Sequence, residues 1–294
     1  FLAGLPHGAY FGVAALVAAG AVPVDQRARA IARVMMGLTV AILIGAPLGT
    51  WAGNLFGWQI AFAGVGVIAL LTALLIRLFV PVQPFDAQAS PLRELSALVK
   101  QRVLVTIAIA CIGCGGMFSI FSYVMPTLTQ QAGMREALGP LVLVIFGLGS
   151  IAGNLIGGRM ADKNLMRAIP TILVWCAVVQ GLFYFAANQV WSGLLFVGLV
   201  GTSMALAPSL QTRLMDVAED AQTMAASMNH AAFNGANALG AWLAGLVISA
   251  GFSWSSTGLV GTGLALCGLV IFAWGRWLEK RAEASGQPVA QGYK

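Results

Sequence analysis

Two histidines lie inside long apolar stretches, where few other side chains can carry a charge. His7 belongs to the first apolar stretch and His230 to one near the end of the chain. An imidazole changes its charge near neutral pH, so either residue could take up and release a proton. Every Asp and Glu lies instead in a polar connection or in the tail. Each histidine could equally be a neutral packing residue bonded to a helix carbonyl, and both interpretations stay open.

A polar stripe surrounds the second histidine. His230, Asn234 and Asn237 are spaced by four and then three residues, which places them on one face of a helix. Polar side chains in an apolar environment need hydrogen-bonding partners, so we expect this face to meet protein or water. Hydrogen bonds between helices and contact with a bound small molecule explain the stripe equally well.

The cysteines do not have the spacing of a metal site. Cys111 and Cys114 form one C-x-x-C pair with no second pair or histidine nearby, and Cys176 and Cys267 stand alone in apolar segments. We therefore predict small packing residues, with no metal and no cofactor. The apolar segments also lack paired carboxylates and a phosphate-binding glycine loop, which argues against a membrane-embedded enzyme and an ATP-driven pump.

The elements that carry these residues are long apolar segments. Hydrophobic residues make up 59% of the chain and charged residues 9%, with a mean hydropathy of +0.86, which excludes an ordinary soluble domain. The net charge of +6 does not indicate nucleic-acid binding, because the basic residues are scattered between apolar runs. A helix needs about 20 apolar residues to cross a bilayer, so we predict an all-α integral membrane protein with about nine spans. The predicted spans are 1–22, 31–53, 58–80, 103–127, 138–158, 168–188, 191–211, 223–250 and 256–277.

The basic residues indicate how these spans are oriented. When the connections are assigned to alternate sides, all 16 Lys and Arg residues except Arg135 fall on the same side. Lys and Arg collect on the cytoplasmic side of membranes. We therefore predict a cytoplasmic C-terminus and an outer location for Phe1. Because the chain opens on Phe1 in apolar sequence, without Met, we also expect the gene product to begin further upstream.

Several stretches resemble known motifs. The loop Gly158–Arg167 is similar to the G-x-x-x-D-R/K-x-x-x-R signature of the major facilitator superfamily. Residues 45–53, GAPLGTWAG, look like the fifth-helix motif of twelve-span drug/proton antiporters. Residues 1–12 and 229–240 are similar to the fourth and eleventh helices of the branch named for arabinose efflux permeases. The resemblance covers essentially the whole chain, although Gln59 stands where this branch usually has Arg.

The resemblance implies a helical bundle of two halves joined by a cytoplasmic linker, of which nine of twelve helices are present. It implies a monomeric secondary transporter of the bacterial inner membrane that exports a drug, sugar or nucleoside-like molecule in exchange for protons. An uptake carrier and an uncoupled channel are the alternatives, although no charged ring or filter-like loop indicates a channel. The expected organisation is helices 4–6 at 1–80, a linker at 81–102, helices 7–12 at 103–277 and a cytoplasmic tail at 278–294.

Glycines recur every four residues in two of the helices. The sets are Gly45, Gly49 and Gly53 in the fifth helix, and Gly149, Gly153 and Gly157 in the eighth. Small residues allow helix backbones to approach closely. The resemblance implies that these helices face each other across the two halves, so we expect a sliding seam between them with a bend at Pro47. Ordinary tight packing is the alternative.

The resemblance also implies roles for individual polar residues. The loop residues Gly158, Asp162, Lys163 and Arg167 would form a gate in which the Asp162 carboxylate holds the cytoplasmic side closed. A solvated loop is the alternative, in which exposed ion pairs contribute only about 0–1 kcal/mol. The candidate contacts for substrate or protons are His7, Tyr10, Ser122, Tyr123, Ser203, His230, Asn234 and Asn237.

Overall fold

The structure, a computed structural model, is built from helices. It describes residues 10, 12–14, 17–18, 20–22, 27–80, 100–218 and 222–284. All regular elements in these ranges are helical, which confirms the predicted fold class. The α-helices are α2 (Arg27–Val40), α3 (Ala46–Phe56), α4 (Trp58–Phe79), α6 (Gln101–Ala108), α7 (Gly115–Pro126), α8 (Gly139–Ala186), α9 (Val190–Gly201), α10 (Leu206–Ala218), α11 (Gln222–Ser249) and α12 (Thr257–Ala284). The π-helical turns are η3 (Ala41–Gly45), η4 (Ile109–Gly113) and η5 (Thr127–Gln131), and the 3-10 turns are η6 (Glu136–Leu138), η7 (Thr202–Ala205) and η9 (Trp254–Ser256).

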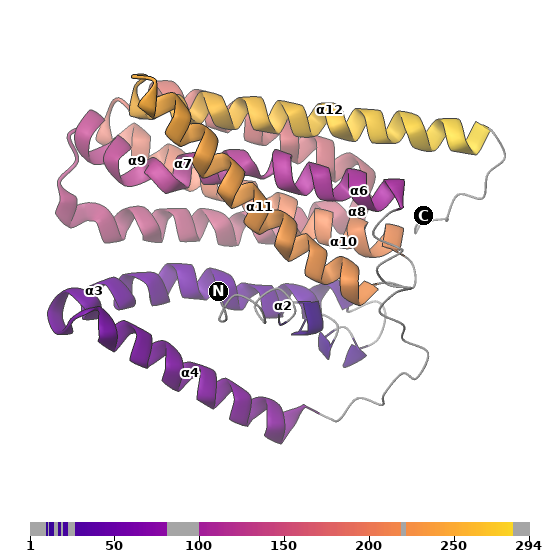
Figure 1. Cartoon of the computed structure of the whole chain (residues 1–294), viewed down its shortest axis with the longest axis horizontal. Helices are drawn as coiled ribbons and strands as arrows, with labels where there is room; N and C mark the ends of the chain where they lie inside the picture. The colour runs from indigo at the N-terminus through magenta and orange to yellow at the C-terminus, as the bar shows by residue number, and fades with distance from the viewer. Residues whose placement is uncertain are drawn as a thin grey trace.

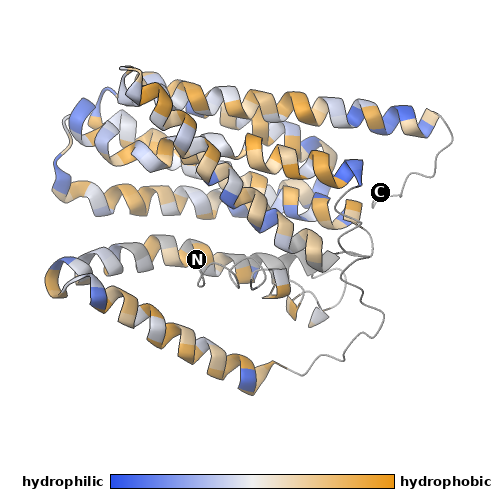
Figure 2. Ribbon diagram, in the orientation of Figure 1, coloured by the Kyte–Doolittle hydropathy of each residue, from blue (hydrophilic) through white to orange (hydrophobic). Residues whose placement is uncertain are grey.

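These helices combine into stretches that can cross a membrane. Within the described ranges, 7 stretches are long and apolar enough to do so: Met36–Phe56, Trp58–Phe79, Gln101–Gln131, Glu136–Ala186, Val190–Ala218, Ser227–Ser249 and Trp254–Ala284. Each matches one predicted span, except Glu136–Ala186, which holds both 138–158 and 168–188. Hydrophobic residues dominate along the helices, and hydrophilic ones gather toward the ends of several of them (Figure 2). The predicted span 1–22 lies largely outside the described residues.

Helix α8 contains a reversal. Its 48 residues would extend about 72 Å as one straight helix, more than twice the roughly 30 Å of the hydrocarbon core. Asn164 has non-helical backbone angles (φ −164°, ψ 96°) and separates the two legs. Its side-chain oxygen then accepts a hydrogen bond of 2.9 Å from the backbone N–H of Arg167, which caps the second leg. The prediction of two spans is therefore consistent with one helical element.

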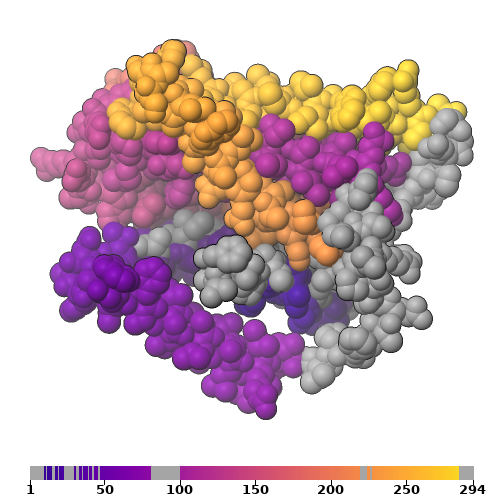
Figure 3. Space-filling view, viewed as in Figure 1, coloured from indigo at the N-terminus to yellow at the C-terminus, as the bar shows by residue number. Residues whose placement is uncertain are grey.

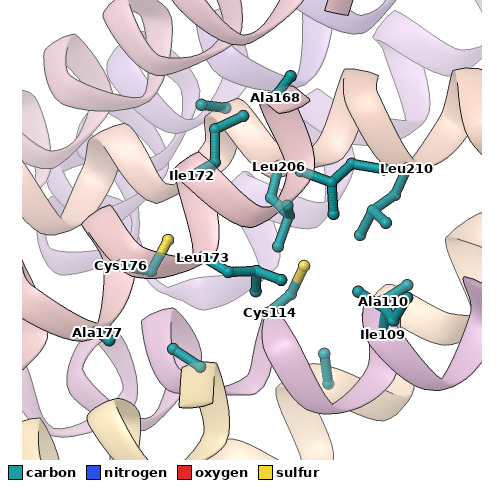
Figure 4. Close-up of a cluster of buried hydrophobic side chains, with 14 of the residues drawn as sticks. Ile109, Ala110, Cys114, Ala168, Ile172, Leu173, Cys176, Ala177, Leu206 and Leu210 are labelled. Carbon is teal, nitrogen blue, oxygen red and sulfur yellow. The ribbon is translucent and has the colours of Figure 1, made fainter. Parts of the chain in front are cut away.

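Residues 101–284 form what we call the C-terminal bundle, in which α6 to α12 pack together (Figure 1). One of its cores joins small and branched side chains from η4, α8 and α10. Leu173 of α8 points toward Cys114, and Cys176, Leu206 and Leu210 belong to the same cluster (Figure 4). Cys114 and Cys176 are 6% and 1% exposed, which agrees with the packing role predicted for them.

Two helices of the C-terminal bundle extend beyond the predicted spans. The span predicted to end at residue 211 continues to Ala218, and the one predicted to end at 277 continues to Ala284. The predicted ends were wrong because the extra turns carry charged residues, which a hydropathy criterion treats as solvated connections. Two of these charged residues, Arg213 and Glu279, form an ion pair with each other.

The elements between residues 27 and 80 lie beside the bundle. Helix α2, η3 and α3 contact α8, whereas α4 has no buried residue. Its apolar surface is at the edge of the molecule, away from the C-terminal bundle (Figure 3). The predicted linker at 81–102 falls mostly outside the described residues, and the boundaries of the proposed halves stay a prediction.

Candidate functional site

The polar stripe of α11 begins one turn after a contact between this helix and the N-terminal part of the chain. Ser227, one turn before His230 on the same helix face, packs against Gly12, where a β-carbon would lie 3.1 Å from the Ser227 backbone nitrogen. His230 is partly buried and has an interaction partner. Asn234 and Asn237 are exposed, and their amides make no hydrogen bond with any residue that the structure describes. A role of the two amides in binding substrate stays a prediction.

Tyr123 connects α7 to neighbouring elements. Its hydroxyl donates a hydrogen bond of 3.3 Å to the carbonyl oxygen of Ala241 on α11, and its ring lies 6.2 Å from that of Trp254 in η9. Its neighbour Ser122 is exposed. Tyr10 is 49% exposed and has an interaction partner. His7, predicted on the same N-terminal helix, lies outside the described residues.

Ser203, one of the candidate contacts for substrate, lies in the interior of the C-terminal bundle, and its role stays a prediction. It is 6% exposed and accepts a hydrogen bond of 3.4 Å from the side-chain nitrogen of Gln180 on α8. Both residues line a small space inside the C-terminal bundle, together with Cys114 and Cys176. The physical reason is that a buried amide needs a polar partner, and Ser203 is the one within reach of Gln180. The sequence assigns Ser203 to the predicted span 191–211, the tenth helix of the resemblance, but does not show which face of that helix carries it.

The glycines of the predicted eighth helix, which lie in the first leg of α8, also pack inside the C-terminal bundle. A β-carbon on Gly153 would lie 2.8 Å from the α-carbon of Thr202, and one on Gly157 would lie 2.6 Å from that of Ala205. Gly149 meets Gly198 of α9 in the same way. The prediction that this glycine set faces the fifth helix was therefore wrong, since α9 and η7, which belong to the predicted span 191–211, occupy the groove. Tight backbone packing, the alternative interpretation, accounts for it.

The fifth and eighth helices nevertheless meet two residues before each glycine set begins. Leu43 of η3 lies against Gly147, where a β-carbon would be 3.2 Å from the Leu43 Cδ1 atom. The π-helical turn η3 directly precedes Pro47, which has no N–H to donate to the carbonyl of residue 43 and so interrupts the regular helix at the predicted bend. A β-carbon on Gly49 would have nothing within 4 Å among the described residues, and one on Gly45 would meet only Ala41 of its own segment. Gly53 is similarly close only to the nearby Trp58.

The loop with the signature sequence is exposed at the reversal of α8. Asp162, Lys163 and Arg167 are all exposed, and Gly158 is partly buried. The carboxylate of Asp162 makes no ion pair with any residue in the described ranges. The gate function of this loop stays a prediction.

A partly buried cluster of charged residues was not predicted from the sequence. Arg213 of α10 forms an ion pair with Glu279 of α12, and these side chains are 17% and 12% exposed. Arg276 donates a second bond of 3.1 Å to the other Glu279 oxygen. The sequence places these residues in polar connections or the tail. The spacing of Arg276 and Glu279, three residues apart on one helix, was the available signal.

This chain is similar in sequence to a family of known proteins and to several of its members. The profile of the Major Facilitator Superfamily matches residues 1–221 and, in a second match, 124–292. The chain is 35% identical over 280 residues to the inner membrane transport protein YdhP of Escherichia coli K12, covering 92% of this chain and 70% of that protein. It is 27% identical to the putative transporter AraJ of the same organism, covering 98% of this chain and 73% of AraJ. It is also 28% identical to a probable sugar efflux transporter of Helicobacter acinonychis, covering 91% and 68%.

The two profile matches together extend over nearly the whole chain. The similarity to YdhP, at 35% identity, also extends over 92% of this chain. The resemblance in the loop Gly158–Arg167 and in residues 45–53 is thereby confirmed at the level of the family. The chain, a multi-pass helical membrane protein, belongs to the Major Facilitator Superfamily of transporters.

Proposed function

We propose that this protein exports a small polar organic molecule, with a sugar-like or drug-like polar surface, across the bacterial inner membrane in exchange for protons. Its relatives are named as transporters, which are not enzymes. The direction of transport is supported by the name of the sugar efflux relative. Cytoplasmic placement of the C-terminus, supported by the distribution of Lys and Arg, is part of the same proposal.

The observation that carries the substrate class is the polar stripe of α11. Two exposed amides, on Asn234 and Asn237, stand on a helix that is otherwise apolar enough to span a membrane. An amide offers both donors and an acceptor, which suits hydroxyl-bearing molecules. Ser227, one turn before the stripe on the same face, contacts Gly12, which supports a location near the junction of two parts of the chain, where transporters of this kind bind their substrates.

Proton coupling requires a group that titrates during the cycle. His230 adjoins the two amides on the same face and is partly buried, so its protonation would change the charge beside a bound substrate. We propose His230 and His7 as the candidates within this chain. The halves at 1–80 and 103–277, joined by 81–102, would rock about the site, and the exposed Asp162 loop would control the cytoplasmic side.

Inside-out vesicles from cells that express the full gene product test this proposal. With an acidic lumen, labelled sugars and antibiotics should accumulate in the lumen, and a protonophore should abolish the accumulation. Replacing both Asn234 and Asn237 by Ala should lower the rate about tenfold, because each neutral hydrogen bond contributes about 0.5–1.5 kcal/mol.

Thr72→Ala on α4 is the control, because the Thr72 hydroxyl bonds only the Ile68 carbonyl of its own helix, at 2.8 Å. Net release of the substrate from the lumen would indicate an uptake carrier. Equilibration that ignores the proton gradient would indicate a channel. Undiminished transport by the double variant would remove the stripe from the substrate site.

A further inference from the structure

A cleft opens at the end of the C-terminal bundle where α6 begins and α10 and α12 end. It has a volume of about 60 Å³, and its lining includes three guanidinium groups, from Arg102, Arg213 and Arg276, and one carboxylate, from Glu279. Pockets for drug-sized ligands measure roughly 300–1,000 Å³. This cleft is therefore too small for the transported molecule, but it exceeds the roughly 10–15 Å³ that one water molecule requires. A group of a few heavy atoms fits it.

The charges in the cleft are unbalanced. Glu279 accepts from both Arg213 and Arg276, so the single carboxylate is shared by two guanidinium groups. The guanidinium of Arg102 has no hydrogen bond or ion pair with any described residue, and it repels Arg213 electrostatically. Asp216 attracts Arg213 from α10 but is not part of the lining. Three positive groups and one negative group therefore leave two positive charges in excess in the lining.

Such an excess favours an anion. Arginine binds phosphate through paired, charge-assisted hydrogen bonds, and burying unpaired charge is costly unless a counter-charge is supplied. The cleft is closed deeper in the bundle by Val105, Ile109 and Phe272. A basic rim above apolar walls suits an amphiphile better than a free ion.

The neighbouring surface of α12 indicates that the cleft opens at headgroup level. Trp277 directly follows Arg276 and is 48% exposed, and the Arg281 guanidinium lies 4.1 Å from the centre of its ring. Exposed tryptophans are enriched at the boundary between hydrocarbon and headgroups. The phosphates of membrane lipids lie at this depth.

We propose that this cleft binds the phosphate of an anionic phospholipid, with Arg102 as the guanidinium that has no partner among the described residues. The lipid phosphate joins the ends of α6, α10 and α12 by bonding to Arg102 and Arg276, while Glu279 keeps Arg213 in place. Bound lipid therefore stabilises this end of the bundle, a role separate from the transport of substrate.

The experiment uses the full-length protein purified in dodecylmaltoside. Its thermal unfolding is measured with added dioleoylphosphatidylglycerol, with dioleoylphosphatidylcholine and with inorganic phosphate. Phosphatidylglycerol should raise Tm more than phosphatidylcholine does, and native mass spectrometry should show retained phosphatidylglycerol. Arg102→Gln should weaken this retention about tenfold, the factor expected for loss of one hydrogen bond to a charged group.

Arg77→Gln is the matched control, because Arg77 is an exposed basic residue in the last turn of α4, outside the cleft. It should retain phosphatidylglycerol like the parent. If Arg102→Gln yields too little protein, Arg102→Lys, which keeps the charge but loses the paired geometry, should show an intermediate loss. Equal retention by the parent and the Arg102 variants would overturn the proposal. An equal rise in Tm with inorganic phosphate would assign the cleft to a free anion instead of a lipid.

Discussion

Leu43 and Gly147 are in direct contact across the boundary between the N-terminal elements and the C-terminal bundle: a β-carbon on Gly147 would lie 3.3 Å from the Leu43 β-carbon. The contact pairs the fifth and eighth helices, and Gly147 is used because any larger residue would push Leu43 away. A disulfide requires β-carbons about 3.5–4.5 Å apart, which is within a small adjustment of this geometry.

We therefore expect the pair Leu43→Cys and Gly147→Cys to form a disulfide under mild oxidation in a background where the four native cysteines are replaced by Ala. The control pair, Leu43→Cys with Gly157→Cys, should not react, because position 157 faces Ala205. Mobility on non-reducing gels, after cleavage of the connecting chain, measures the bond. Efficient reaction of the control pair would mean that α8 turns its other face to η3.

The two glycine sets should respond differently to an added methyl group. Gly153→Ala places a β-carbon 2.8 Å from the Thr202 α-carbon, whereas at Gly49 nothing described lies within 4 Å. Overpacking costs about 1–3 kcal/mol, so Gly153→Ala should lower Tm in detergent by several degrees and Gly49→Ala should not. Equal Tm values for the two variants would contradict the packing assigned to the eighth helix.

For the loop, we expect Asp162→Asn to reduce transport at least about tenfold while membrane expression stays near that of the parent. Asp162 is exposed and pairs with no described residue, so its loss leaves folding intact, whereas a gate that depends on its charge fails. An exposed ion pair alone would contribute only about 0–1 kcal/mol. Vesicle transport and quantitative blotting check the two parts, and unchanged efflux would reduce the loop to a topology signal.

The buried ion pair leads to a prediction about stability. Arg213→Met leaves the Glu279 carboxylate, 12% exposed, with only Arg276, and because the pair is partly exposed the cost should lie below the about 3–5 kcal/mol of breaking a fully buried pair. Adding Glu279→Leu should recover most of the lost Tm, because the carboxylate that lost Arg213 is then removed and the remaining Arg276 is 40% exposed. Thermal unfolding of the single and double variants measures the effect. A double variant less stable than Arg213→Met would show that the carboxylate has another essential partner.

The histidines are tested through pH. An unperturbed imidazole titrates near pH 6.5, so removing a coupling histidine should flatten the dependence of efflux on pH between about 5.5 and 7.5. We expect this for His7→Ala, and for His230→Ala if the α11 stripe carries the proton. Efflux rates across this range, with Thr72→Ala as the reference, provide the measurement. A curve that superimposes on the parent assigns that histidine to packing.

Much of the architecture could be read from local sequence. Whether about 20 consecutive residues are apolar enough to replace water by lipid depends on those residues alone, so eight of the nine predicted spans correspond to described helices. The common face of His230, Asn234 and Asn237 follows from helix geometry. The interruption at Pro47 follows from its missing N–H. Each of these features is a property of a few neighbouring residues.

Features that depend on a partner from a distant part of the chain could not be read in this way. Gly149–Gly157 could pack against any helix, and only the assembled bundle places the backbone of 198–205 in that groove. Ser203 turns inward because Gln180, on another helix, needs a hydrogen bond. Arg213 and Glu279 looked like solvated ends, yet helix packing brings them together and buries them. Composition and periodicity are local, whereas burial and pairing are decided by which surfaces meet when the helices assemble.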